Sequence, residues 1–375
     1  NQQAMQIVGY RLYKMTLNCL LPFKIASGVI DRCETLLLEV WDAEGRRGLG
    51  EAVPSPLLTG ECLEGCRWTL QEQLLPLLRG INPWSLEDLH REMLTLTRGK
   101  SARCCVDVAV HNLQAGILGL PLSRLLGTGI TRFETNYSIG ICSLEETEEL
   151  ARRFEREGYR RIKLKVGVDP EYDLERIIRL NEILSPSTWL RLDANCGWSR
   201  SAAVQVLRRC ERRDARIELV EQPVARDDFD GLREVRHKTV FPIAADESVQ
   251  GVDCAKRLLE GQCVDILNIK LMKSAGLWQA RQIATLAHAY RCRLMVGGMV
   301  GESEISVTAA AALAASHRFD YADLDADILL QDTPFTGMEP ARGALRLETP
   351  FRVWDPELRT SALRDDLEVV TEWQL

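Results

Sequence analysis

The stretch Ile162-Lys163-Leu164-Lys165-Val166 (IKLKV) decides how the rest of the chain is interpreted. Its alternation of lysine with apolar residues has the period of two that is typical of a β-strand, so Lys163 and Lys165 lie on the same side. Taken alone, the pattern favours an exposed edge strand, because lysines are rarely buried. Burying two ammonium groups is costly unless other charges compensate, so the interpretation depends on the residues further along the chain.

From residue 133 onward, short apolar strands alternate with helical patterns. We expect strands at 134–141, 160–167, 188–193, 216–221, 241–246, 264–270, 292–297 and 320–325, and helices at 143–158, 170–184, 199–213, 226–236, 251–260, 275–290 and 303–316. Eight strands with seven intervening helices are most economically a (β/α)7β-type TIM barrel over residues 131–330. A doubly wound open sheet is the alternative fold.

The two ends of the chain are interpreted as an α+β capping domain. Residues 6–17 and 33–41 have the pattern of strands with a mobile loop between them, and the segment 45–61 is rich in Gly and Pro. Helical patterns occur next at 62–78, 85–96 and 101–118. We therefore predict a capping domain over 1–130, which the tail 331–375 returns to complete.

Composition excludes several classes of protein. The net charge of −7, with both signs interspersed over 375 residues, argues against nucleic acid or an anionic membrane as the partner. No apolar run reaches the roughly 18 residues that a membrane span needs. The twelve cysteines are scattered, and the five histidines show no zinc-ligand spacing. We expect a reduced, cytoplasmic enzyme that acts on a small molecule and forms a homo-oligomer.

Five charged residues recur at nearly constant spacing. Lys165, Asp193, Glu221, Asp246 and Lys270 end successive predicted strands, at separations of 28, 28, 25 and 24 residues. In a barrel, such side chains surround one mouth, where the active sites of this fold lie. A single Asp at a strand end is more often a helix N-cap. Three carboxylates at matched depth instead predict a site for Mg²⁺, with Mn²⁺ as an alternative, since oxygen ligands favour these ions over zinc.

The motifs around these residues resemble the enolase superfamily, and within it the muconate-lactonizing branch. The matching segments are KLK (163–165), RLDANCGW (191–198), LVEQPV (219–224), ADES (245–248) and NIKLMKSAG (268–276). The segment IELVEQPVARDDFDGL and the D-x-D at 323–325 are most similar to the dipeptide epimerases, the group that includes L-Ala-D/L-Glu epimerase. This resemblance covers nearly the whole chain and implies an isomerase.

The resemblance also implies roles for individual residues. Asp193, Glu221 and Asp246 would bind the metal, and Lys165 and Lys270 would be the acid/base pair. Two bases on opposite faces of one carbon allow a 1,1-proton transfer through an enediolate, which inverts the α-carbon of the C-terminal residue of a dipeptide. Lys163 would tune Lys165 electrostatically. Cycloisomerases, o-succinylbenzoate synthases and N-acylamino acid racemases keep the same lysines, so they remain the alternative, as does a barrel without activity.

Further residues are expected at the substrate. Asp323 and Asp325 would pair with the α-ammonium of a dipeptide, unless they are simply a polar strand end. Ser138, Lys24, Asn195 and Gly298 complete the predicted substrate-binding set, with Asn195 and Glu247 also supporting the carboxylates. Four features depart from the family pattern: K-S-A-G at 273–276, an additional residue in 297–305, a C-terminal tail without the usual PGLG, and Ser27–Gly28 where the epimerases of alanyl-glutamate carry an arginine.

Overall fold

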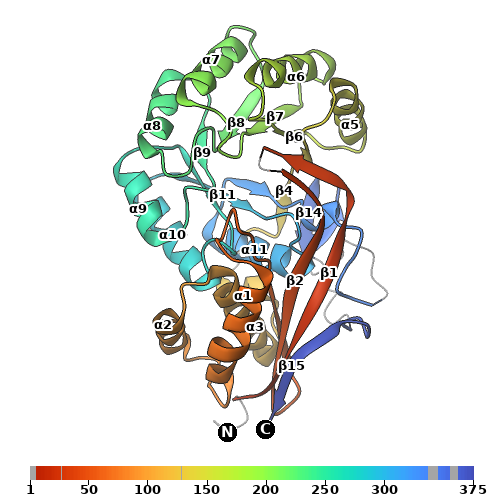
Figure 1. Ribbon diagram of the computed structural model, residues 1–375, viewed down its shortest axis with the longest axis vertical. Coiled ribbons are helices and arrows are strands. Elements are labelled where there is room, and N and C mark those ends of the chain that lie inside the picture. The colour runs from red at the N-terminus through yellow and green to blue at the C-terminus, as the bar shows by residue number, and fades with distance from the viewer. Residues whose placement is uncertain (1–5, 27, 128, 337–344, 355–361) are drawn as a thin grey trace.

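The computed structural model describes residues 6–26, 28–127, 129–336, 345–354 and 362–375 (Figure 1). Its two parts are a ring of strands and helices and, beside it, an elongated antiparallel sheet with a few helices. Within the described ranges, no helix is both long and apolar enough to cross a membrane.

Eight parallel strands form the central sheet, in the spatial order in which they occur in the chain. They are β5 (Tyr137–Ile139), β6 (Arg161–Lys165), β7 (Trp189–Asp193), β8 (Ile217–Glu221), β9 (Ile243–Ala245), β10 (Ile266–Ile269), β11 (Arg293–Gly297) and β12 (Tyr321–Asp323). The ends of the sheet meet, because the amide of Leu324 donates a 2.9 Å hydrogen bond to Thr135 Oγ1, next to β5. The order never reverses, so the structure confirms the barrel and excludes the doubly wound sheet.

One helix comes after each of the first seven barrel strands. They are α5 (Leu144–Arg156), α6 (Pro170–Ile183), α7 (Arg200–Glu211), α8 (Phe229–Lys238), α9 (Val252–Glu260), α10 (Leu277–Ala289) and α11 (Glu304–His317). The prediction that α8 begins at residue 226 is wrong by three residues. Asp228 is its N-cap, and its side chain accepts a hydrogen bond from the amide of Gly231.

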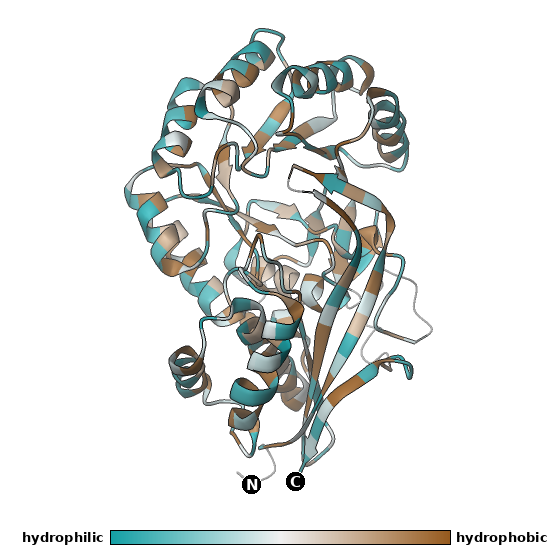
Figure 2. Ribbon diagram, in the orientation of Figure 1, coloured by the Kyte–Doolittle hydropathy of each residue, from teal (hydrophilic) through white to brown (hydrophobic). Residues whose placement is uncertain are grey.

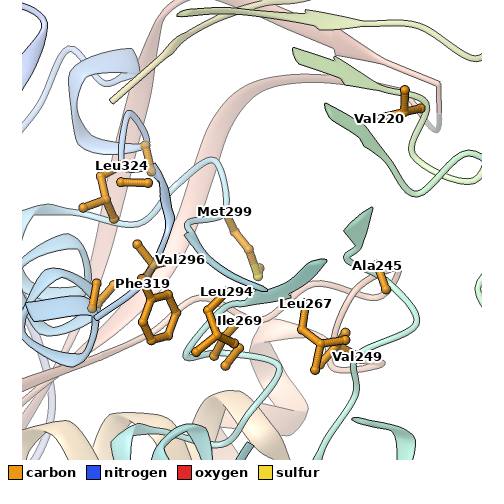
Figure 3. Close-up of a cluster of buried hydrophobic side chains, with 14 of the residues drawn as sticks. Val220, Ala245, Val249, Leu267, Ile269, Leu294, Val296, Met299, Phe319 and Leu324 are labelled. Carbon is orange, nitrogen blue, oxygen red and sulfur yellow. The ribbon is translucent and has the colours of Figure 1, made fainter. Parts of the chain in front are cut away.

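Alternation along each strand separates the apolar core from the polar interior of the barrel. Leu164, Leu192 and Val220 are fully buried in the large hydrophobic cluster that the barrel strands share with the helices, and Figure 3 shows part of it. The neighbouring residues of opposite parity, Lys165 and Asp193 among them, therefore point to the inside of the barrel. In the hydropathy colouring, the helices show mixed teal and brown faces around this core (Figure 2).

The barrel interior is closed below the charged residues by a small apolar plug. Leu219, Ala244, Ile266 and Met295 form a separate buried cluster, with Tyr321 packed against it. Leu219 and Ile266 point to the same side of the sheet as the polar residues two positions further along their strands, Glu221 and Asn268. The polar side chains thus lie above an apolar floor, which strengthens electrostatic interactions among them.

The N-terminal part is built on three antiparallel strands, β1 (Ile7–Ile25), β2 (Gly28–Asp42) and β3 (Arg47–Ala52), with helices α1 (Leu63–Trp68), α2 (Leu86–Leu96), α3 (Lys100–Leu118) and α4 (Leu122–Leu126). Residues 69–74 and 75–78 extend α1 as π-helical and 3-10 turns. The helical predictions for this part are confirmed.

One prediction in this part is wrong. The expected loop between the first two strands is instead a continuation of both, with Phe23 paired to Ile30 and Ile25 paired to Gly28. The Gly/Pro-rich segment contains β3, whose glycines allow the strand to approach α3. A Cβ on Gly50 would lie 1.9 Å from the carbonyl oxygen of Cys105. Gly48 and Gly50 serve close packing within the strand, whereas Gly45 and Gly60 lie outside it and have positive φ values of 75°.

The C-terminal tail returns to both parts of the molecule. β15 (Glu368–Gln374) pairs with β1 in antiparallel fashion, as predicted for a tail that returns to the N-terminal part. Earlier in the tail, β13 (Leu345–Glu348) and β14 (Phe351–Trp354) form a three-stranded sheet with β4 (Arg132–Glu134), just before the first barrel strand. A short 3-10 turn (Asp327–Leu329) links the last barrel strand to the tail.

The tip of the β1–β2 hairpin reaches the mouth of the barrel. The carbonyl of Lys24 accepts a 2.7 Å hydrogen bond from the amide of Ile141, just after β5. Cys19 forms a β-bridge with Leu330, beyond β12. Because both contacts lie past the carboxyl ends of barrel strands, the hairpin covers the end of the barrel at which active sites of this fold are found (Figure 1).

Candidate active site

The five predicted strand-end residues converge inside the barrel mouth. Asp193, Glu221 and Asp246 are fully buried, and their carboxylate oxygens lie within 4.8 Å of one another. Lys165 Nζ lies 2.6 Å from Asp193, and Lys270 Nζ lies 2.7 Å from Asp246. Among the described residues, this triad is the one cluster of acidic, histidine or cysteine side chains that meets the geometry of a metal site.

The triad fits a hard divalent cation. Burial, reinforced by the charge of Asp193, raises the pKa of Glu221 to about 8. Glu221 Oε2 is buried and accepts no hydrogen bond from the described residues, although Lys163 Nζ lies 2.8 Å away in an ion pair that is poorly aligned for one. A buried carboxylate oxygen that accepts no aligned hydrogen bond, in a set of three carboxylates and no softer ligand, fits a Mg²⁺ site. These three residues would hold the ion.

The lysines in the barrel are tied to the same carboxylates. Burial lowers the pKa of Lys270, but the charges of Asp246 and Glu221 outweigh burial and hold that pKa well above its usual range. The pKa of Lys163 is raised in the same way, mainly by Asp193 and Asp323. A cation bound by Asp246 and Glu221 would weaken their hold on the ammonium of Lys270 and so favour its neutral, basic form.

Asp323 and Asp325 lie together on the wall of the mouth, but they differ in their partners. The strand β12 ends at Asp323, so the expectation that both residues belong to it is wrong for Asp325. Asp323 accepts hydrogen bonds from Asn136 at 2.7 Å and from Lys163 at 2.6 Å. Asp325 accepts from Asn136 at 3.2 Å and from Ser138, and it forms no ion pair with a cation in the described ranges.

The charge of Asp325 is therefore less well compensated than that of Asp323. Burial, followed by repulsion from Asp323, raises the pKa of Asp325 to about 7. A carboxyl group in this state would be stabilised in its ionised form by an incoming ammonium group. Of the two residues of the D-x-D motif, Asp325 is the one available to such a ligand.

Asn195 links Lys165 on β6 to Glu247, which follows Asp246 of the triad. Its backbone has the left-handed conformation, with φ of 41°, and its amide donates to Asp193 at 3.0 Å. Its side chain accepts from Lys165 at 3.1 Å and donates to Glu247 at 3.0 Å. These contacts suit a residue that positions the charged groups, as expected for Asn195 and Glu247.

Gly298 and Lys24 lie at the edge of this cluster. A Cβ on Gly298 would lie 2.9 Å from the side chain of Glu302, so the chain is tightly packed there. Lys24 occupies the hairpin tip, and its side chain is exposed, whereas the adjacent Phe23 is buried. The structure does not bring the ammonium of Lys24 into contact with the lysines and carboxylates of the mouth. Ser27 lies outside the described residues.

Four further residues of the site were missed by sequence reasoning. Lys273 contacts both the side chain and the carbonyl of Asp246, and Asn268 donates to Glu221 at 2.8 Å. Arg191 donates to Asn136 at 2.8 Å, and Asn136 holds the D-x-D pair. Strand parity could have found three of them, because positions 136, 191 and 268 lie two residues before Ser138, Asp193 and Lys270.

Comparison with known families agrees with this geometry. Residues 145–350 match the family model described as enolase C-terminal domain-like, and residues 9–127 match the N-terminal domain of mandelate racemase and muconate lactonizing enzyme. The chain belongs to the mandelate racemase/muconate lactonizing enzyme family of the enolase superfamily.

Its similar relatives include several epimerases. The L-Ala-D/L-Glu epimerase of Bacillus subtilis is 35% identical over 89% of this chain and 92% of its own length. The L-Lys-D/L-Arg epimerase of Methylococcus capsulatus is 38% identical over 87% of this chain and 92% of its own. The dipeptide epimerase of Enterococcus faecalis, solved with Mg and L-Leu-L-Tyr, superposes with a TM-score of 0.88 at 31% identity, over 97% of this chain and all of that one.

Proposed function

We propose that this chain is a Mg²⁺-dependent dipeptide epimerase that inverts the α-carbon of the C-terminal residue. One observation carries the proposal: in the order of the barrel, the strands of Asp193, Glu221 and Asp246 lie between the strand that bears Lys165 and the strand that leads to Lys270. A substrate carboxylate held at the triad would therefore have one lysine on each side. The relatives that are epimerases of dipeptides, some solved with Mg and a dipeptide, support this assignment.

The mechanism is derived from the positions of the side chains. When bound at the triad, Mg²⁺ supplies a Lewis acid that stabilises negative charge on the substrate carboxylate. We propose that Lys165 or Lys270, whichever is neutral, removes the α-proton from its own face. The opposite lysine, held as an ammonium by the acidic residue beside it, returns a proton from the other face. The apolar floor beneath the site keeps these interactions strong.

Lys163 would serve the reaction without exchanging protons with the substrate. Its ammonium lies within 3.0 Å of Asp193, Glu221 and Asp323, and the side chain is almost fully buried. We propose that it holds the triad together and adds positive charge near the reacting carbon. Asn195 would position Lys165, and Gly298 and Ser138 would contact the substrate at the wall of the mouth.

The α-ammonium group of the dipeptide would bind Asp325. This buried carboxyl group has hydrogen-bond donors but no ion-pair partner among the described residues, and an ammonium group supplies the missing charge. A cycloisomerase, an o-succinylbenzoate synthase or an N-acylamino acid racemase takes a substrate without that cation. The state of Asp325 therefore favours a dipeptide over the substrates of those enzymes.

We propose a capping domain of residues 1–130 and 331–375 around a barrel of 131–330, in a cytoplasmic homo-oligomer that binds neither nucleic acid nor membranes. All twelve cysteines lie in described residues and are free thiols, which supports a reducing compartment. The exposed ammonium of Lys24 remains the candidate for an acidic side chain of the substrate.

Exchange of the α-proton tests the proposed reaction directly. The Mg²⁺-loaded protein is incubated in deuterated water with a library of L,L-dipeptides, and uptake of one deuterium is read by mass. We expect exchange at the C-terminal residue together with appearance of the L,D-diastereomer, and no turnover of the matched N-acetyl dipeptides. Exchange confined to acylated amino acids would instead support the racemase alternative.

A further inference from the structure

Gly297 is a position of the barrel mouth at which a side chain is missing. It ends β11 and pairs in parallel register with Asp323 of β12, and its other neighbour is β10, the strand that leads to Lys270. Met295, two positions earlier on β11, belongs to the apolar floor, so Gly297 also faces the inside of the barrel. In the order of the strands, the bare position therefore lies between Lys270 and Asp323.

The backbone conformation does not explain this glycine. The φ angle of Gly297 is not positive, so the residue lies outside the left-handed region in which glycine is favoured. What a side chain would lack is space. A Cβ atom would lie 2.6 Å from Oδ1 and 2.9 Å from Nδ2 of Asn268, and 3.0 Å from Cε of Lys270. Non-bonded carbon atoms pack at about 3.5–4.0 Å, so a methyl group here would have to displace at least one of these side chains.

Both side chains beside Gly297 belong to the site. Asn268 is fully buried and donates a 2.8 Å hydrogen bond to Glu221. Lys270 is buried as well, and its ammonium is held by a 2.7 Å ion pair with a carboxylate of the triad. The Cε atom of a lysine carries Nζ, so a displacement of Cε moves the reacting nitrogen directly. The glycine thus leaves room for the last carbon of the Lys270 stem.

We propose that Gly297 is a positioning residue for one of the two bases: its missing side chain leaves the space through which Lys270 reaches the substrate. This role rests on the proposed two-lysine epimerisation. It concerns one face of the substrate only, because Lys165, the proposed base of the other face, lies on β6, which is not a neighbour of β11 in the barrel. A side chain at position 297 should therefore unbalance the two directions of proton transfer, whereas a loss of stability or of metal would lower both.

The variant Gly297→Ala tests this role by α-proton exchange in deuterated water, measured in saturating Mg²⁺ from pure L,L and pure L,D dipeptides. The diastereomer that depends on Lys270 is the one whose exchange is abolished in Lys270→Ala. We expect Gly297→Ala to slow exchange of that diastereomer at least tenfold more than exchange of the other. Gly116→Ala is the matched control on α3, where a Cβ would lie 3.3 Å from the carbonyl oxygen of Arg47, and it should leave the ratio of the two rates unchanged.

A second pair of variants covers the case in which Gly297→Ala does not fold. Asn268→Ser removes the amide group that lies nearest to the added methyl group, so the stem of Lys270 is the remaining close contact. Comparison of Asn268→Ser with the double variant Asn268→Ser/Gly297→Ala should show the same change of at least tenfold in the ratio of the two exchange rates.

Equal slowing of both diastereomers, in Gly297→Ala or within the second pair, would overturn this role and leave the proposed function standing. The same conclusion follows if neither variant that carries the alanine gives the circular dichroism spectrum of the wild type, since the glycine would then serve the packing of the barrel. Absence of exchange in the wild type would instead refute the proposed function itself.

Discussion

The ammonium nitrogen of Lys163 lies 2.6 Å from a carboxylate oxygen of Asp323. This ion pair joins the second strand of the barrel to the eighth, past the first strand that lies between them, and it connects the carboxylate triad to the D-x-D motif. Because both side chains are almost fully buried, the pair depends on its other neighbours for compensation.

Replacing Lys163 by Met should therefore destabilise the protein by about 3 kcal/mol, since it leaves buried carboxylates without their cation. The loss should be smaller in saturating Mg²⁺, because the bound ion compensates for part of the missing charge. Urea unfolding of both proteins, with chelator and with Mg²⁺, measures the two differences. An equal loss under both conditions would contradict binding of the ion near Lys163.

Metal binding itself should depend on each carboxylate of the triad. Asp193→Asn, Glu221→Gln and Asp246→Asn should each weaken Mg²⁺ binding by at least tenfold, measured by calorimetry, because each removes one charged oxygen ligand. Asp253→Asn, on the exposed side of α9, is the matched control. Chelation should abolish epimerisation and added Mg²⁺ should restore it; full activity in excess chelator would rule the assignment out.

The two lysines should be separable by the stereochemistry of exchange. Lys165→Ala and Lys270→Ala should each stop net epimerisation, because inversion needs a base on one face and an acid on the other. Each variant should also lose α-proton exchange for only one of the two diastereomers. Exchange is measured in deuterated water from pure L,L and pure L,D dipeptides, and wild-type turnover in both directions by either variant would refute the two-base mechanism.

Asp325→Asn should raise KM for dipeptides more than it lowers kcat, because it removes the proposed partner of the α-ammonium group and not a proposed acid or base. Loss of such a charged contact costs roughly 2–5 kcal/mol when it leaves a buried partner charge. N-acetylation of the substrate should produce a loss of similar size in the wild type. In the variant, acetylation should matter less; an undiminished effect there would place the ammonium group at another residue.

Substrate preference should reflect the hairpin tip. With Gly28 in the tip and the Lys24 side chain exposed, the described residues of the tip place no arginine to receive an acidic side chain. We therefore expect L-Ala-L-Leu and L-Ala-L-Phe to be turned over at least as well as L-Ala-L-Glu, in a comparison of kcat/KM. A preference of a hundredfold for the glutamate dipeptide, roughly 2.7 kcal/mol, would show that a basic contact comes from elsewhere.

The barrel is predictable from sequence because its signals are local and repeated. Each strand ends on a charged residue at a similar interval, so the pattern alone places Lys165, Asp193 and Glu221 at one mouth. Alternate residues of a strand face the same side, so the residues two positions before Ser138, Asp193 and Lys270 also point into the barrel. This rule would add Asn136, Arg191 and Asn268 to the predicted site.

Other features depend on contacts between distant segments. The contact between Lys273 and Asp246 arises in the loop after β10, where no periodicity operates. The sequence between Phe23 and Ile30 resembles a loop because nothing in it shows that its strands continue toward the barrel. The close approach of Gly50 to α3 likewise depends on a partner more than fifty residues away.

The β1–β2 hairpin and the barrel contribute to this site through different kinds of residue. The barrel supplies buried charges that compensate one another, and a change in any of them disturbs several others. The hairpin meets the barrel end partly through backbone contacts, such as those of Lys24 with Ile141 and of Cys19 with Leu330. Because Lys24 and Val29 at the tip are exposed, we expect substitutions there to cost little stability, so that substrate preference could change by mutation without disturbing the proposed proton-transfer residues.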